Sequence, residues 1–305
     1  IMDTGKIKDI DGLKKILASL NSEHKLNFVN VSLPEEQAYL VRMALPYVSK
    51  KDLRGSIEVQ LEEYIPLRAE EAVFDYEIIS EDERGYDLEI SALPLVVAQS
   101  YFNLFDGTGL TPLIFEMEAQ AIARAVIPQG DKNTHMVVDF GETRTGLSVV
   151  SDGVVMFTST LDIGGHTLDD AIKKTFKVTS EEAEKMKKEY GLVKNSGNKE
   201  FFFTLIHPIS ILKDELNKHF VYWHTHPEPG EKERKKIDSI ILCGGDSNLL
   251  GFSDYLSANL KVPVSVANVW VNVNSFEAYV PEISLKNSLR YATAIGLVLG
   301  NLYPQ

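Results

Sequence analysis

HMVVDFGETRTGLSVVSDGVVMFTST, residues 135–160, is predicted to form three short strands joined by two turns. The first strand ends in Asp139-Phe140-Gly141-Glu142-Thr143, so an acid, a glycine and a hydroxyl lie at its carboxyl end. Glycine lets backbone N–H groups approach an anion closely, and an acid at this place can hold a divalent metal through water. The pattern therefore fits both an ordinary turn of a β-meander and one half of a phosphate clamp.

Two further glycine pairs follow along the chain. LDIGGHTLDDAIKKTF, residues 161–176, opens a predicted helix at Gly164 and Gly165. SIILCGGDSNLLGF, residues 239–252, reads as a buried strand, the Gly244-Gly245 turn and the start of a helix. A helix N-terminus beyond such a turn favours an anion through its dipole. Each turn alone is weak evidence, because structural turns of this kind are common.

Composition limits the class of protein. The 305 residues suffice for two domains, and the formal net charge of −13 argues against a partner that is nucleic acid. The single cysteine, Cys243, forms no internal disulfide and favours a reducing compartment. No apolar run reaches the roughly 18 residues that span a bilayer. Any membrane association is therefore expected to come through a partner.

The first 127 residues alternate predicted helices and strands, which indicates an α/β protein. Within them, residues 36–105 form a compact β-α-β-β-α module with a hairpin turn at Asp82-Glu83-Arg84-Gly85. Leu88, Ile90 and Ala92 alternate along the second hairpin strand and are expected to share one buried face. The polar residues around 128–133 mark a lobe boundary.

Several helices and a charged loop are predicted after the three-strand segment. Thr179 and Glu182 form a capping-box pattern, and Gly191 ends that helix. PISILKDELNKHFVYW is predicted to be a helix with Pro208 in its first turn. HTHPEPGEKERKK, residues 224–236, reads as a charged loop, and residues 287–302 as a closing helix.

The order of these motifs resembles the second lobe of the actin-like ATPase superfamily. GLTPLIFEMEAQAIARAV and NSLRYATAIGLVLG resemble the two connecting segments of that fold. Within the superfamily the chain resembles the PilM family of type IV pilus assembly, most distinctly in SLPEEQAYLVRMALPYVSKKDLRGSIEVQLEEYIPLRAEEAVFDYEII. The resemblance implies an α/β actin-like (ribonuclease H-like) two-lobed fold with an accessory subdomain of the FtsA/PilM type. The implied lobes are residues 1–127, with the accessory subdomain at about 36–105, and residues 134–283, followed by a closing helix at 284–305 that returns to the first lobe.

The resemblance also implies an ATP site with Mg²⁺ between the lobes. Asp139, Gly141 and Thr143 match the second phosphate loop, with Asp139 near a metal-bound water. Gly164 and Gly165 match the next helix start, close to the same pocket. Gly244 and Gly245 match the adenosine motif. Glu215 and Lys218 match positions that border the adenine and ribose. Glu118 matches the acid that positions water in related ATPases, and it fits equally a structural residue at a helix start.

One part of the family pattern is missing. The first phosphate loop, an N-terminal strand with Asp-x-Gly followed by small hydroxyl residues, has no counterpart in these 305 residues. Asp3-Thr4-Gly5 resembles it only superficially, and IMDTGKIKDIDGLKKIL resembles the segment that follows the first meander. Either residues upstream of Ile1 supply that loop, or this member binds nucleotide weakly.

The implied function is a cytoplasmic scaffold of the pilus inner-membrane platform. It is expected to bind ATP with little or no hydrolysis, and to grip the cytoplasmic N-terminal tail of PilN in a groove beside the accessory subdomain. Other platform proteins and the motor ATPases are further expected partners. Three alternatives stay open: an active ATPase in which Glu118 and Asp139 position water and metal, a cytoplasmic domain like that of the type II secretion protein GspL, and an FtsA-like filament protein. The last is disfavoured because the chain ends at NLYPQ without a membrane helix.

Overall fold

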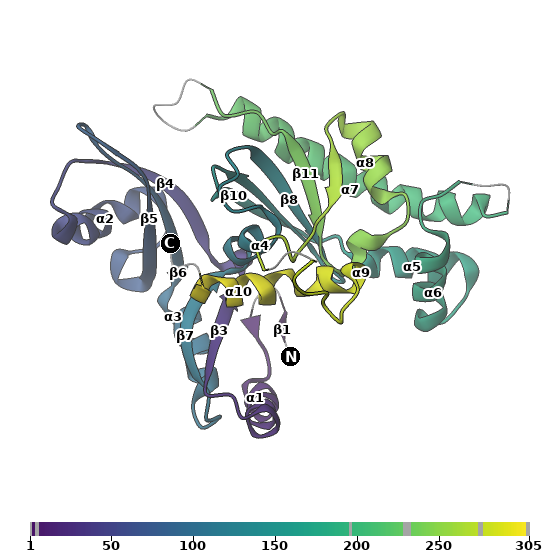
Figure 1. The fold of residues 1–305 in the computed structure, drawn as a ribbon, viewed down its shortest axis with the longest axis horizontal. Helices are drawn as coiled ribbons and strands as arrows, with labels where there is room; N and C mark the ends of the chain where they lie inside the picture. The colour runs from purple at the N-terminus through teal and green to yellow at the C-terminus, as the bar shows by residue number, and fades with distance from the viewer. Residues whose placement is uncertain (1, 4–5, 195–196, 228–232, 274–276, 303–305) are drawn as a thin grey trace. The chain divides into compact units, whose positions relative to one another are not determined.

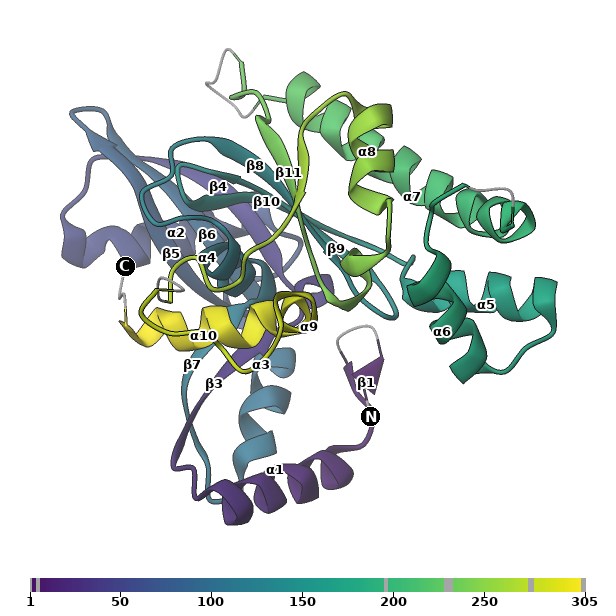
Figure 2. The same ribbon diagram turned by 45° about the vertical axis from the view of Figure 1, so that its right-hand side comes forward.

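The computed structural model describes residues 2–3, 6–194, 197–227, 233–273 and 277–302, so Thr4 and Gly5 lie outside it. The chain divides into two compact units, one formed by residues 1–121 with 300–305 and the other by residues 122–299. The lobe boundaries expected from the sequence stay a prediction. Figures 1 and 2 trace the elements in chain order.

The first unit is built from short sheets and helices. Its elements are β1 (Met2–Asp3), β2 (Lys6–Ile7), α1 (Ile10–His24), β3 (Phe28–Leu33), β4 (Tyr39–Pro46), α2 (Lys50–Tyr64), β5 (Ala72–Asp82), β6 (Gly85–Pro94), α3 (Leu95–Phe102), β7 (Thr111–Met117) and the first four residues of α4 (Glu118–Val126), whose residues 122–126 belong to the second unit. One-turn 3-10 helices lie at Glu35–Gln37, Ala69–Glu71 and Asn103–Phe105. Strands β3 and β7 pair in parallel.

The predicted β-α-β-β-α order around residues 36–105 is confirmed as β4, α2, β5, β6 and α3. The three strands form an antiparallel sheet in the order β4-β6-β5. Helix α2 presents Leu53, Ile57 and Leu61 at four-residue spacing, and all three are buried. They share one core cluster with Leu88 and Ile90 of β6, so one face of this sheet is apolar as the strand alternation predicted.

The second unit contains the β-meander and the longer helices. Its elements are β8 (Thr134–Phe140), β9 (Thr145–Ser151), β10 (Val154–Leu161), α5 (Gly165–Phe176), α6 (Ser180–Tyr190), α7 (Lys199–Thr225), β11 (Ser239–Cys243), η4 (the 3-10 helix Gly245–Asn248), α8 (Phe252–Leu260), β12 (Val264–Val266), α9 (Leu285–Ser288), η5 (the 3-10 helix Leu289–Tyr291) and α10 (Ala292–Leu302), whose residues 300–302 belong to the first unit. The capping box at Thr179 and the helix end at Gly191 are confirmed.

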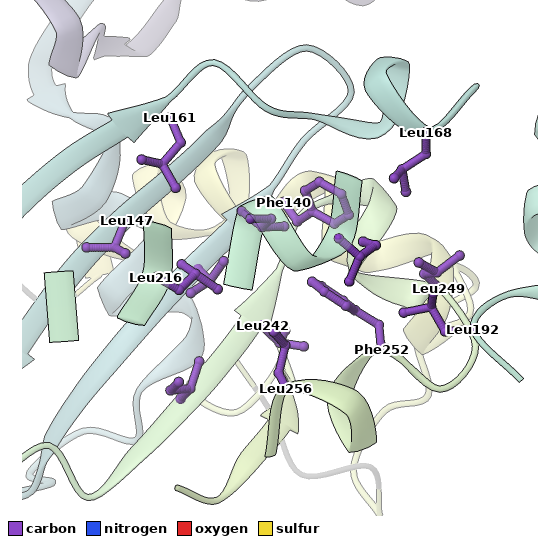
Figure 3. Close-up of a cluster of buried hydrophobic side chains, with 14 of the residues drawn as sticks. Phe140, Leu147, Leu161, Leu168, Leu192, Leu216, Leu242, Leu249, Phe252 and Leu256 are labelled. Atoms are coloured by element: carbon purple, nitrogen blue, oxygen red, sulfur yellow. The ribbon is translucent and has the colours of Figure 1, made fainter. Parts of the chain in front are cut away.

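A single five-stranded sheet organises this unit. Its order is β10-β9-β8-β11-β12, with the meander antiparallel and β8, β11 and β12 parallel to one another. The central strands β8 and β11 are buried along nearly their whole length, as expected for strands covered on both faces. Figure 3 shows part of the core beside the sheet, where the rings of Phe140 and Phe252 lie 5.2 Å apart between centroids.

Helix α7 corrects two sequence-based predictions. It begins at Lys199, so Pro208 lies in its interior and not in its first turn, and it continues through Thr225 into the segment predicted as a loop. An interior proline removes one helix hydrogen bond and costs about 3 kcal/mol. That cost is offset because apolar side chains on both sides of the proline are buried on one face, namely Phe201, Leu205, Ile209, Leu212 and Leu216. Although α7 has 27 residues, no helix in the described ranges is both long and apolar enough to cross a bilayer.

Candidate functional site

The two strand-turn motifs meet at one edge of the five-stranded sheet. Strands β8 and β11 are parallel neighbours, and their register places Asp139 opposite Cys243. The carboxyl ends of parallel strands lie at the same edge of a sheet, so the Gly141 and Gly244 turns both begin there. Residues 104 positions apart are thereby brought together.

Asp139 is partly buried at this edge. Its Oδ1 atom accepts a hydrogen bond from the Cys243 thiol, with 3.9 Å between sulfur and oxygen. Burial raises the pKa of Asp139 to about 6, and the thiol contact opposes the shift only in part. The carboxyl is therefore mainly ionised at neutral pH and can attract a cation, although its charge is unusually costly to keep there.

Gly244 packs directly on this carboxyl. It has φ of 88° and ψ of 158°, a region that is essentially restricted to glycine. A Cβ atom at this position would lie 2.4 Å from Asp139 Oδ1 and 2.5 Å from the Phe140 carbonyl oxygen. Only glycine lets the second turn approach Asp139 so closely.

The start of α5 is docked on the first turn. The Gly165 N–H donates to the Gly141 carbonyl at 2.9 Å, and the His166 N–H donates to the Glu142 carbonyl at 2.7 Å. A Cβ atom on Gly164 would lie 2.5 Å from that same Glu142 oxygen. The N–H groups at the start of α5 thus hold the first turn in place, and a role of the glycine pair in nucleotide binding stays a prediction.

Other backbone donors remain beside Asp139. Within the described part of the chain, the N–H groups of Glu142 and Thr143 in the first turn and of Gly245 in the second donate no hydrogen bond. All three residues are exposed. Unbonded amides on glycine-containing turns, next to an ionised carboxylate, suit an anion with a cation at its side.

Lys187, Asp169 and Asp246 form a buried ion cluster next to the second turn, which the sequence did not predict. Lys187 of α6 is 5% exposed, and its Nζ lies 2.7 Å from Asp246 Oδ1 and 3.0 Å from Asp169 Oδ2. Burial acts to lower the pKa of Lys187, but the hydrogen bonds and charges of Asp246 and Asp169 outweigh it and leave that pKa raised. The lysine is therefore charged and joins α6, α5 and η4.

Asp246 completes the contact with α5. A Cβ atom on Gly165 would lie 2.1 Å from Asp246 Oδ2, so glycine is needed there for the carboxylate to fit. One sequence signal points to this cluster, because Lys187 follows the buried Ala183 by four residues on α6. A lysine on the apolar face of an amphipathic helix needs a buried counter-charge.

Glu215 and Lys218 lie elsewhere on the second unit. Both are on α7, where Lys218 Nζ and Glu215 Oε1 form a pair 2.5 Å apart. No described contact joins either residue to the Asp139 or Gly244 turns. Their assignment to an adenine or ribose site stays a prediction.

Glu118 belongs to the first unit and is the first residue of α4. Burial raises the pKa of the nearby Tyr101 to about 12, and the negative charge of Glu118 adds to the effect. The next amide, that of Ala119, donates to Glu35 Oε1, so a different acid caps this helix. A role of Glu118 in positioning water stays a prediction.

Comparison with protein families places this geometry in context. Residues 1–302 match the family model described as type IV pilus assembly protein PilM. The match covers both units and all the elements of the candidate site.

Solved structures show the same fold at low sequence identity. A structure of a PilM-PilN type IV pilus biogenesis complex superposes with a TM-score of 0.79 at 20% identity, covering 99% of this chain and 88% of that one. MreB5 of Spiroplasma citri bound to ADP gives 0.62 at 15% identity, over 99% of this chain and 78% of that one. The ethanolamine utilization protein EutJ from Carboxydothermus hydrogenoformans gives 0.56 at 17% identity, over 98% and 77%. The predicted α/β actin-like fold class is confirmed.

Proposed function

The chain belongs to the family of type IV pilus assembly protein PilM, and we propose that it serves pilus assembly as a nucleotide-binding scaffold that holds the cytoplasmic tail of PilN. A role in type IV pilus assembly follows from the family. Nucleotide binding and the partner tail are the proposed parts.

One observation carries the nucleotide proposal. The in-register pairing of β8 with β11 packs Gly244 on the Asp139 carboxylate and leaves unbonded amides on both turns. The proposed occupant of these amides is the phosphate chain of ATP, with Asp139 attracting Mg²⁺ through water. The fold neighbour MreB5 was solved with ADP, which supports a nucleotide as the class of ligand.

Asp139→Asn is expected to weaken Mg-dependent nucleotide binding by about tenfold to a hundredfold, because a hydrogen bond to a charged group contributes about 1.5–3 kcal/mol. The measurement is the fluorescence titration of the full chain with a labelled ATP analogue, with Mg²⁺ and with a chelator. Asp162→Asn, which changes an exposed acid of the same unit, is the matched control. Equal affinities of the wild type and Asp139→Asn would remove the proposed role of this carboxylate.

The same preparation separates a scaffold from an enzyme. Phosphate release in a single turnover is expected to be negligible for a scaffold. Release that is abolished by Glu118→Ala would instead identify an active ATPase in which that acid positions the attacking water.

The proposed partner is an extended peptide, the N-terminal tail of PilN, docked beside the accessory sheet β4-β6-β5. The fold neighbour with the TM-score of 0.79 was solved as a PilM-PilN complex, which supports this choice. Binding would bring the chain to the inner membrane through its partner, where further platform proteins and the motor ATPases are proposed to meet it.

A labelled peptide of the PilN tail from the same organism is expected to bind the chain saturably, because main-chain hydrogen bonds and side-chain pockets recognise extended peptides. Fluorescence anisotropy measures the binding, and a peptide of the same composition in scrambled order is the control. Equal binding of both peptides would show only a non-specific charge attraction to this acidic chain.

A further inference from the structure

Glu89 is a buried acid in the centre of the accessory sheet. It lies on β6, the middle strand, and is 3% exposed. Strand alternation places it on the face opposite to Leu88 and Ile90, which pack in the apolar cluster with α2. The proposed site at Asp139 belongs to the other unit and does not involve this residue.

The Glu89 side chain connects the sheet to the first turn of α4. Its Oε1 accepts hydrogen bonds from Gln120 Nε2 at 3.3 Å and from the Ser91 hydroxyl at 3.5 Å. Gln120 Nε2 also lies 3.3 Å from Ser91 Oγ. The other carboxyl oxygen, Oε2, is buried without a hydrogen-bond partner among the described residues. Two long hydrogen bonds from neutral donors to a single oxygen, with the other oxygen unpaired, are a poor environment for a carboxylate and a better one for a carboxylic acid.

The neighbouring strands add no available positive charge. Register places Glu77 of β5 and Arg42 of β4 directly opposite Glu89. Arg42 is engaged by Asp87 in a two-pronged ion pair, with its Nε 2.7 Å from Asp87 Oδ1. Burial, followed by the charge of Glu77, raises the pKa of Glu89 to about 8.

The remaining elements that pack here carry few ionisable groups. The next acid on the same face of β5 is Asp75, opposite Ser91. Helix α4 contributes Glu118 in its first turn, and α3 contributes only Tyr101, whose raised pKa keeps it neutral. Burial and the charge of Glu77 on β5 thus oppose ionisation of Glu89, and the hydrogen bonds from Ser91 and Gln120 offset them only in part.

We propose that Glu89 is a proton-operated latch, which in its neutral form holds the accessory sheet against the first turn of α4 and in its ionised form favours separation of the two. The opened form lets the carboxylate reach water, where its pKa returns to the ordinary range. The latch thus couples the position of α4, where Glu118 also lies, to proton concentration.

The pH window follows from the direction of the pKa shift. Because the closed state holds the pKa at about 8, the latch is strongest below the ordinary glutamate pKa. Between the ordinary glutamate pKa and about pH 8, the equilibrium constant for opening rises about tenfold for each pH unit. Above about pH 8 the closed state also ionises, so the pH dependence stops. Neutral pH lies inside this sensitive range.

Hydrogen exchange of the full chain tests the latch without nucleotide or partner. After division by intrinsic exchange rates, protection of the amides in the first turns of α4 is expected to fall about tenfold or more between pH 6 and pH 7.5. Glu89→Gln, which keeps an acceptor for Gln120 but cannot ionise, is expected to abolish this fall. Glu63→Gln, at an exposed position of α2, is expected to retain it.

A spectroscopic titration keeps the test independent of any variant. The Glu89 side-chain carboxyl carbon, followed by NMR in the wild type, is expected to titrate near pH 8. An ordinary pKa for that carbon, or an unchanged pH dependence of exchange in Glu89→Gln, would overturn the latch.

Discussion

Lys187→Met is expected to lower the free energy of unfolding by about 3–5 kcal/mol, because it leaves buried negative charge uncompensated. Lys187 is 5% exposed and lies within 3.0 Å of both Asp169 and Asp246. Asp169 Oδ1 has no hydrogen-bond partner among the described residues, so the lysine is the main compensation for that side chain. Methionine preserves the length and apolar stem of the side chain and removes only its charge.

Denaturant titration of wild type and variant measures this change. Lys188→Met is the matched control, because Lys188 is the next residue on α6 and makes an exposed ion pair with Glu184. Such a pair contributes about 0.3–0.5 kcal/mol. Adding Asp169→Asn and Asp246→Asn to Lys187→Met is expected to recover part of the loss. A loss of similar size in the two single lysine variants would contradict the buried-cluster interpretation.

Gly244→Ala is expected to destabilise the second unit by about 2–4 kcal/mol and to abolish nucleotide binding. About 1–3 kcal/mol arises from the backbone, since the φ of 88° at this residue is nearly closed to alanine. The methyl group would also lie 2.4 Å from Asp139 Oδ1 and 2.5 Å from a backbone oxygen. One of the two contacts is with rigid backbone, so the turn must move and the Asp139 carboxylate moves with it.

Gly245→Ala is the control for this prediction. The nearest atom to a Cβ at Gly245 is Arg290 Cβ at 3.8 Å, which is ordinary contact, and its φ is not positive. Thermal unfolding is therefore expected to distinguish the two adjacent glycines. Loss of nucleotide binding in Gly244→Ala with unchanged stability would assign Gly244 to the ligand alone. An equal loss of stability in Gly244→Ala and Gly245→Ala would contradict the argument from backbone geometry.

Both predictions concern the way the second turn is held. Gly244 fixes it against β8 through Asp139, and Lys187 fixes it against α5 and α6 through Asp246. Asp139 and Lys187, which are distant in the sequence, therefore hold the turn from two sides. Such bracing keeps a binding turn in place before a ligand arrives, which reduces the ordering cost of binding.

Local sequence patterns were sufficient for most elements. They predicted the β-α-β-β-α order around residues 36–105, and alternation predicted the buried face of β6 through Leu88 and Ile90. These features depend on neighbours within a few residues, so they can be read directly from the chain. The local pattern at Pro208 wrongly predicted a helix start there. The apolar side chains buried along the whole of α7 stabilise the helix by more than the proline destabilises it.

Sequence alone determined the family, the strand-turn motifs and the glycines at which backbone must come close. It did not determine which polar side chains face one another, since Lys187 and Asp246 are 59 positions apart and Glu89 and Gln120 are 31 apart. Those pairings exist only when sheet register and helix docking bring distant side chains together out of water. Burial then changes their energetics, so tertiary structure decided which lysine braces the site and which glutamate keeps its proton.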